Sequence, residues 1–181
     1  MLGFSSSPSS SHPFKTVSFG NSNIGPYYWV GHCHNGVDYY AGQTFHIPEK
    51  GVLQKIKLYC SLIQGSPDAT LSIYDFDEVN HIWKSKRNET IKTITPSLEN
   101  QWIEFEIQGI EVHKGECYGF KLTCQRGGMM ALAECPWDKP NPYAEGEEWV
   151  GSSSLPEGKF QKEFDFAFQG EIDISTKTQF L

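Results

Sequence analysis

Hydrophobic and polar residues alternate along most of this 181-residue chain. In residues 101–108, which read QWIEFEIQ, Ile103, Phe105 and Ile107 occupy every second position. A period of two places such residues on one face of a β-strand and their neighbours on the other. The same alternation predicts strands in 55–62, 70–75, 117–125 and 164–169, with weaker strands in 43–47, 90–95 and 129–134.

Turn-forming clusters separate these segments, as in PEKG at 48–51 and GSPD at 65–68. No window shows the sustained i, i+3, i+4 hydrophobic spacing of a helix. About eight short strands, each with one apolar face, predict an all-β fold. Two antiparallel sheets would pack face to face as a β-sandwich, and jelly-roll topology is a natural arrangement for eight strands.

The length fits one domain. Residues 1–13, MLGFSSSPSSSHP, predict a flexible Ser/Pro-rich arm. They lack the basic and apolar regions of a secretory signal. Residues 14–174 form the predicted β-sandwich domain, and 175–181 form a short polar tail.

Charge narrows the range of partners. The chain has 15 Lys and Arg against 22 Asp and Glu, a formal net charge of −7. Binding to nucleic-acid phosphates requires a basic surface, so an acidic chain is not expected to bind nucleic acid. No apolar run approaches the ~18 residues of a membrane helix, and membrane insertion is not expected either.

The order of several short phrases resembles a known family. The chain reads AGQTF, VLQKIKLYCSLIQGSPDATLSIYD, QWIEFEI, VHKGECYGFKL, NPYAEGEEW and FDFAF, in that order. This order, over residues 41–170, resembles a bacterial jelly-roll β-sandwich module that is appended to surface and exported proteins. The resemblance implies a non-catalytic domain of the carbohydrate-binding or adhesive kind, so the expected partner is a carbohydrate or another protein.

The loop segment 135–150, CPWDKPNPYAEGEEWV, has the composition of a sugar site. Sugar rings stack on exposed aromatic residues, and their hydroxyls bind polar side chains held on a rigid scaffold. Three prolines stiffen this segment. The predicted ligand-binding residues are Trp137, Asp138, Asn141, Tyr143 and Trp149. The alternative is that Tyr143 and Trp149 close one end of the sandwich, and the recurrence of the NPYA phrase in the resembling family implies such a structural role for Tyr143.

A second aromatic cluster comprises Tyr27, Tyr28 and Trp29 together with Tyr39 and Tyr40. It either lines a groove or covers one sheet. We favour the cover, because large aromatic side chains bury apolar area efficiently. In the polar segment 80–88, Trp83 is expected to be exposed.

The sequence predicts no metal site and no cofactor. The run His32-Cys33-His34 lacks the CxxC or HxxxH spacing of a structural zinc site. The segment 75–78, DFDE, offers oxygen ligands, and a structural calcium ion there is the alternative to a solvated acidic turn.

No complete catalytic motif is present in the sequence, and the chain is expected not to be an enzyme. Segment 170–174, GEIDI, resembles a strand of jelly-roll β-glucanases, in which Glu171 would be the nucleophile. Alternation places Glu171 and Asp173 on one face, but Ser175 or Thr176 occupies the position of the acid. A divergent glycoside hydrolase is therefore the weaker alternative.

An odd number of cysteines, five, cannot be wholly paired within one chain. Cys60 and Cys124 fall on apolar strand faces, where a free thiol behaves as a small hydrophobic group. The sequence thus predicts mostly reduced thiols, which favour a non-oxidising compartment. The family resemblance implies export, and both localisations remain open.

Overall fold

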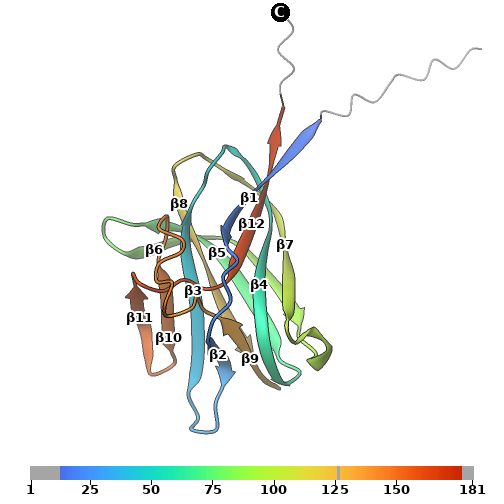
Figure 1. Cartoon of the computed structure of the whole chain (residues 1–181), viewed down its shortest axis with the longest axis vertical. Coiled ribbons are helices and arrows are strands. Elements are labelled where there is room, and N and C mark those ends of the chain that lie inside the picture. Colours follow the sequence, from blue (N-terminus) through green and yellow to red (C-terminus); the bar gives the residue numbers. More distant parts are fainter. Residues whose placement is uncertain (1–12, 126, 177–181) are drawn as a thin grey trace, which may run out of the picture.

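The computed structural model describes residues 13–125 and 127–176 (Figure 1). The predicted arm, apart from Pro13, and the tail from residue 177 onward lie outside the described residues. The strands are β1 (Phe14–Asn21), β2 (Tyr27–His32), β3 (Asp38–His46), β4 (Gly51–Gly65), β5 (Asp68–Asp77), β6 (Ile82–Thr93), β7 (Gln101–Val112), β8 (Cys117–Gln125), β9 (Gly128–Ala133), β10 (Glu148–Ser152), β11 (Leu155–Gln161) and β12 (Phe168–Ser175).

Helical structure in the described part of the chain is limited to the short turn η1 (Pro96–Leu98). A helix long and apolar enough to cross a membrane does not occur there.

All of the strand pairs are antiparallel, which confirms the predicted all-β antiparallel class. Hydrogen bonds follow the order β1-β12-β4-β9-β2-β3-β8-β5-β6, while β7 pairs with β4 and the β10–β11 hairpin pairs with β3. The described residues form 12 strands rather than about eight, because β1, β2, β10 and β11 lie in segments without clear alternation. Hydrogen bonds join all of them in one curled sheet, nine along this path and three beside it, so this pairing does not confirm a two-sheet jelly roll.

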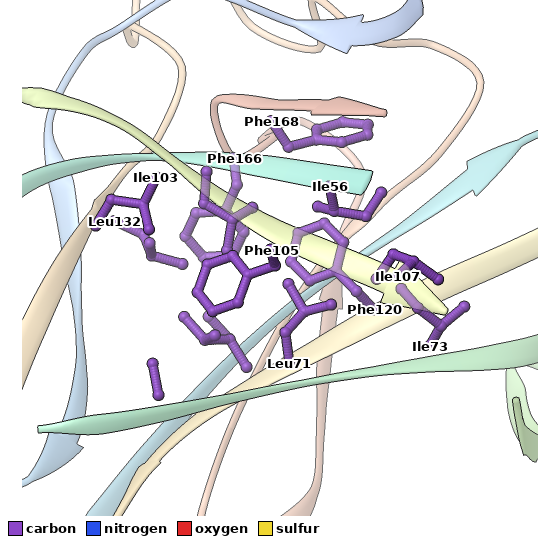
Figure 2. Packing of buried hydrophobic residues seen from close by; sticks show 14 of the residues in the cluster. Ile56, Leu71, Ile73, Ile103, Phe105, Ile107, Phe120, Leu132, Phe166 and Phe168 are labelled. Carbon is purple, nitrogen blue, oxygen red and sulfur yellow. The ribbon is translucent and has the colours of Figure 1, made fainter. Parts of the chain in front are cut away.

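The hydrophobic core lies inside the curl (Figure 2). Ile56 of β4 and Phe105 of β7 approach Leu71 of β5 and Phe120 of β8 from the opposite side, as Figure 2 shows. The alternation in 101–108 is confirmed, since Ile103, Phe105 and Ile107 are all buried. Burial of these faces fixes the register of each strand, because a slip by one residue would expose every apolar side chain.

The segment 164–168 departs from the predicted pattern. Asp165, which alternation assigns to the solvent side, has 0% exposed surface, and β12 begins only at Phe168. Its carboxylate accepts hydrogen bonds from Gln43 Nε2 at 2.8 Å and from the Tyr143 backbone N–H at 3.0 Å. Gln43 Oε1 in turn accepts from the Phe166 backbone N–H at 3.1 Å. Asp165 is buried because these two donors, one on each carboxylate oxygen, replace the water it gives up.

All five cysteines are free thiols. Cys60 and Cys124 are buried within the core, as the alternation predicted. Burial raises the pKa of both thiols to about 12, so neither forms a reactive thiolate near neutral pH.

We expect Phe105→Ala to lower the free energy of unfolding by about 3–5 kcal/mol, because it leaves a cavity in the core. Ile91→Ala, at an exposed position of β6, should change it by less than about 0.5 kcal/mol. Chemical denaturation followed by tryptophan fluorescence measures both changes. Equal effects of the two substitutions would contradict the assignment of Phe105 to the centre of the core.

Candidate functional site

The structure separates the five predicted ligand-binding residues into two groups. Trp137 is 76% exposed, and Asp138 and Asn141 beside it are also exposed. Tyr143 is only 9% exposed and Trp149 only 1%. The three aromatic side chains therefore do not form the single exposed platform that the sequence predicted.

Trp149 lies on β10, and β11 of the same hairpin covers its ring. Its indole N–H donates to the Glu157 carbonyl at 3.1 Å, and Lys121 Nζ lies 4.4 Å from the centre of its ring. Trp83 packs against it with ring centres 5.7 Å apart. The prediction of an exposed Trp83 is thus wrong, because Trp83 is half-buried in an aromatic cluster that the hairpin completes through Phe160. Neither Trp149 nor Trp83 presents a full ring face to a ligand.

Tyr143 has structural contacts on every side. Its backbone N–H donates to Asp165, and its hydroxyl donates to the His46 carbonyl at 3.5 Å. Its ring meets Phe168 edge to face, with ring centres 5.1 Å apart. These contacts favour the alternative in which Tyr143 closes one end of the fold.

Four residues of the second aromatic cluster, Tyr27, Tyr28, Trp29 and Tyr39, line a surface groove, whereas Tyr40 lies outside it. We define the aromatic groove as the cleft of about 550 Å³ lined by Tyr27, Tyr28, Trp29, Cys33, His34, Tyr39, Gln64 and Met129. Tyr27 and Trp29 meet edge to face at 5.7 Å, as do Tyr28 and Tyr39 at 6.4 Å. The cluster itself was visible in the sequence, but its shape depends on long-range strand pairing.

Strand register positions these rings. Tyr27, Tyr28 and Trp29 pair with 131–133 of β9, and the β2–β3 hairpin brings Tyr39 opposite Gly31. The groove thus rests on paired strands, which hold the rings in place before any ligand arrives.

Polar groups occur among these rings. His34 and Gln64 are exposed and supply imidazole and amide groups. Burial raises the pKa of Tyr28 to about 12, so its hydroxyl keeps its proton and donates to the Gly151 carbonyl at 3.5 Å. The groove therefore combines apolar ring surfaces with hydrogen-bonding groups.

The aromatic groove and the Trp137 loop are connected to chain segments that lie side by side in the structure. The Gly25 N–H donates to the Glu134 carbonyl at 2.7 Å. A side chain at Gly25 would meet Pro136, since an added Cβ would lie 2.5 Å from the Pro136 nitrogen. The segment leading into β2 thus runs against the segment leading to Trp137, and two regions far apart in the sequence become adjacent.

The carboxylates and the histidine considered for catalysis and metal binding each have a partner of their own. Glu171 pairs with Lys57, and Asp173 accepts from the Thr16 hydroxyl at 2.9 Å. Asp75 pairs with Arg87 at 2.8 Å, and Asp77 with Lys84 at 3.1 Å. The structure does not gather the acidic groups of 75–78 into one oxygen cage. In segment 32–34, whose spacing does not match a zinc site, His32 pairs with Asp38 at 2.7 Å.

A buried carboxyl pair joins β10 to the end of β9. Glu148 is 1% exposed, lies near Glu134, and leaves its Oε2 without a partner. Burial, and then the nearby Glu134 carboxylate, raise the pKa of Glu148 to about 9. Burial also raises the pKa of Asp165 to about 6. No sequence signal distinguished Glu148 from the exposed acids beside it.

No protein-family model matches this chain, and a search of curated proteins finds no matching relative. The function is therefore argued from the geometry of the site itself.

We expect Glu148→Gln to make the stability of the fold less dependent on pH. Folding raises the pKa of Glu148 from 4.5 to about 9, so the folded protein holds a proton that the unfolded chain releases in this range. The free energy of unfolding contributed by this group then falls as the pH rises from about 4.5 to about 9. A Gln amide has no titrating proton, so the variant should gain more than about 1 kcal/mol over the natural protein at the alkaline end.

Urea denaturation at several pH values measures this difference. Glu106→Gln, at an exposed side chain, is the control and should keep the natural pH dependence. If Glu148→Gln also kept the natural pH dependence, the proton held by the folded protein would not reside on Glu148 or Glu134.

Proposed function

We propose that this chain is a non-catalytic module that binds carbohydrate in the aromatic groove. The observation that carries the proposal is the combination in one cleft of Tyr27, Trp29 and Tyr39 with the polar side chains of His34 and Gln64. A sugar ring needs both an apolar surface for its C–H faces and hydrogen-bonding partners for its hydroxyls.

Binding would consist of stacking and hydrogen bonding on a preformed surface. The rings of Tyr27 and Trp29 would pack against the apolar face of a sugar, and the Gln64 amide would bind its hydroxyl groups. Because the rings sit on paired strands, little conformational entropy is lost when a ligand binds. Affinity at one such site is weak, and several copies on one surface would raise it by multivalency.

Trp137, Asp138 and Asn141 would extend this site along a longer sugar chain. They are exposed, and their loop begins next to the segment that enters β2. Tyr143 and Trp149 would support the fold beneath the site rather than contact the ligand, as their burial suggests.

For the fold, we propose a jelly-roll sandwich whose two layers are joined at the β2–β3 hairpin. The packing of β4 and β7 side chains against those of β5 and β8 supports this arrangement (Figure 2).

The second candidate is a structural or adhesive domain that binds another protein. It is favoured by large hydrophobic side chains exposed around the entry to β2, namely Ile24, Tyr27 and Trp137. In this case, light scattering would show a stable oligomer or complex, and glycans would not compete with it.

The carbohydrate proposal predicts that Trp29→Ala weakens glycan binding about tenfold, through the loss of a stacking surface. A glycan array identifies the ligand, and calorimetry then measures the dissociation constants of the variants. Trp137→Ala should weaken binding of longer glycans more than that of short ones.

Phe14→Ala is the matched control, because it removes an exposed aromatic residue of β1 outside the groove. It should bind as the natural protein does. An array without any bound glycan, or equal binding by Trp29→Ala and the natural protein, would refute the proposal.

A further inference from the structure

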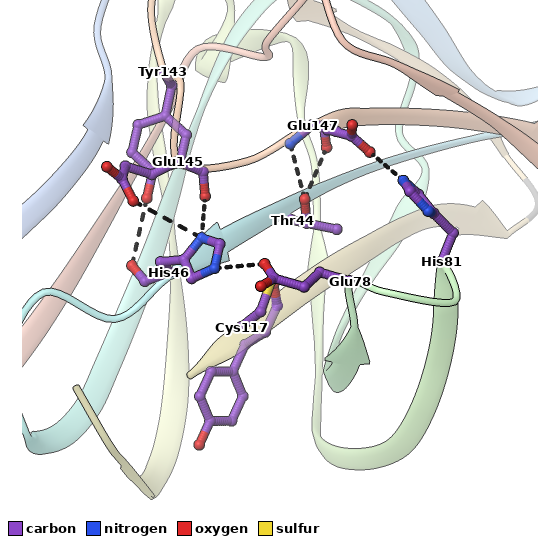
Figure 3. A network of polar contacts seen from close by, with 9 residues as sticks. Thr44, His46, Glu78, His81, Cys117, Tyr143, Glu145 and Glu147 are labelled. Carbon is purple, nitrogen blue, oxygen red and sulfur yellow. Dashed lines mark hydrogen bonds and ion pairs between the residues drawn. The ribbon is translucent and has the colours of Figure 1, made fainter. Parts of the chain in front are cut away.

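A second cleft, of about 390 Å³, lies where β3 and β5 end and β8 begins, and it contains a cluster of metal-binding side chains (Figure 3). His46 ends β3, Cys117 begins β8, and Glu78 directly follows β5. His46 and Cys117 are directly opposed in the β3–β8 ladder, so their side chains share one face of the sheet. The donor atoms of His46, Glu78 and Cys117 all lie within 4.8 Å of one another.

The hydrogen bonds of His46 leave one ring nitrogen directed at Glu78. Nδ1 lies 2.7 Å from the Glu145 carbonyl oxygen, which only accepts, so Nδ1 carries a proton and donates it. Nε2 lies 2.6 Å from a carboxylate oxygen of Glu78, as Figure 3 shows. A nitrogen lone pair and a carboxylate oxygen at this distance require a proton or a cation between them. A backbone carbonyl that fixes Nδ1–H is also the usual outer partner of a histidine that binds metal through Nε2.

The surroundings of the cluster suit a cation. Three carboxylates line the cleft, from Glu78, Glu145 and Glu147, against the single ammonium group of Lys162. Glu147 pairs with His81 at 2.9 Å and with Lys162 at 3.8 Å. Glu78 and Glu145 are more exposed than Glu147, and their charge makes the open side of the cleft negative.

We propose that His46 Nε2, a Glu78 carboxylate oxygen and Cys117 Sγ bind a zinc ion. Imidazole, thiolate and carboxylate are the ligands zinc takes in proteins, whereas calcium and magnesium take oxygen ligands. In a tetrahedral site with bonds of about 2.0–2.3 Å, neighbouring ligand atoms are about 3.3–3.8 Å apart. The exposed Glu78 side chain would move outward from His46 by about 1 Å, and the fourth position would face the cleft.

Zinc bound here would join the end of β5 to the β3–β8 pair. It would replace one ion pair, between His46 and Glu78, by three bonds from three strand ends. The cluster is separate from the aromatic groove, and the two sites share none of their lining residues.

Cobalt(II) and zinc titrations of the full chain, after dialysis against a chelator, test the proposal. We expect one cobalt ion per chain, a thiolate-to-cobalt charge-transfer band, and loss of that band when zinc is added. Cys117→Ser should abolish the band. His46→Gln should weaken zinc binding by more than the ~10–100-fold typical of outer-shell changes. Circular dichroism without metal checks that each variant is folded.

Two further variants make the result decisive. Glu78→Gln changes an exposed side chain, leaves the fold intact, and should weaken zinc binding at least about tenfold. Cys33→Ser, at the half-buried thiol next to His32 and His34, is the control and should keep the band. No charge-transfer band in the natural chain, loss of the band in Cys33→Ser, or unchanged zinc affinity in Glu78→Gln would overturn the assignment.

Discussion

The buried hydrogen bond between Gln43 and Asp165 is the constraint on which the other features depend. Gln43 comes from the middle of β3, and Asp165 precedes β12, so the pair joins two distant parts of the sheet. The remaining Asp165 oxygen accepts from Tyr143, which fixes the long loop before β10. With water excluded, each of these polar groups has only its protein partner, and the cost of losing that partner holds the loop in place.

This connection links the two sites indirectly. By fixing Tyr143, it also positions Glu145, whose carbonyl orients the ring of His46. Through Phe166 it holds the segment that lies against Glu134 at the end of β9, and β9 pairs with the aromatic strand β2. The core supplies most of the stability, while the buried hydrogen bonds around Gln43 and Asp165 determine where the loops lie.

Local pattern predicted the parts of the fold that depend on one strand at a time. Ile103, Phe105 and Ile107 are buried where alternation put them. The pattern failed at Asp165, because alternation assumes that an acid faces water and takes no account of partners 122 residues away in the chain. It also missed β1, β2, β10 and β11, whose segments lack clear alternation, and so the prediction of about eight strands was too low.

The candidate sites were harder to predict, because they consist of residues brought together by strand register. The cluster around Tyr27 and Trp29 was recognisable from composition, yet whether it formed a groove depended on where β9 and β3 lie. His46, Glu78 and Cys117 have no local motif, since 32 and 39 residues separate successive members (78−46 and 117−78). Trp149 was predicted to bind a ligand because its segment has the composition of a sugar site. That composition did not reveal that a hairpin covers the Trp149 ring.

The pairing of β1 with β12 determines how the domain would respond to force. Phe14 lies opposite Ser175, and the Thr176 N–H donates to the Pro13 carbonyl, so both strands leave the sheet at the same end. Tension applied through Pro13 and Thr176 would load the ladder one hydrogen bond at a time, because these bonds lie perpendicular to antiparallel strands. β1 and β12 would separate at low force, which lengthens the chain between the two points of attachment, while β4 and the strands beyond it stayed folded.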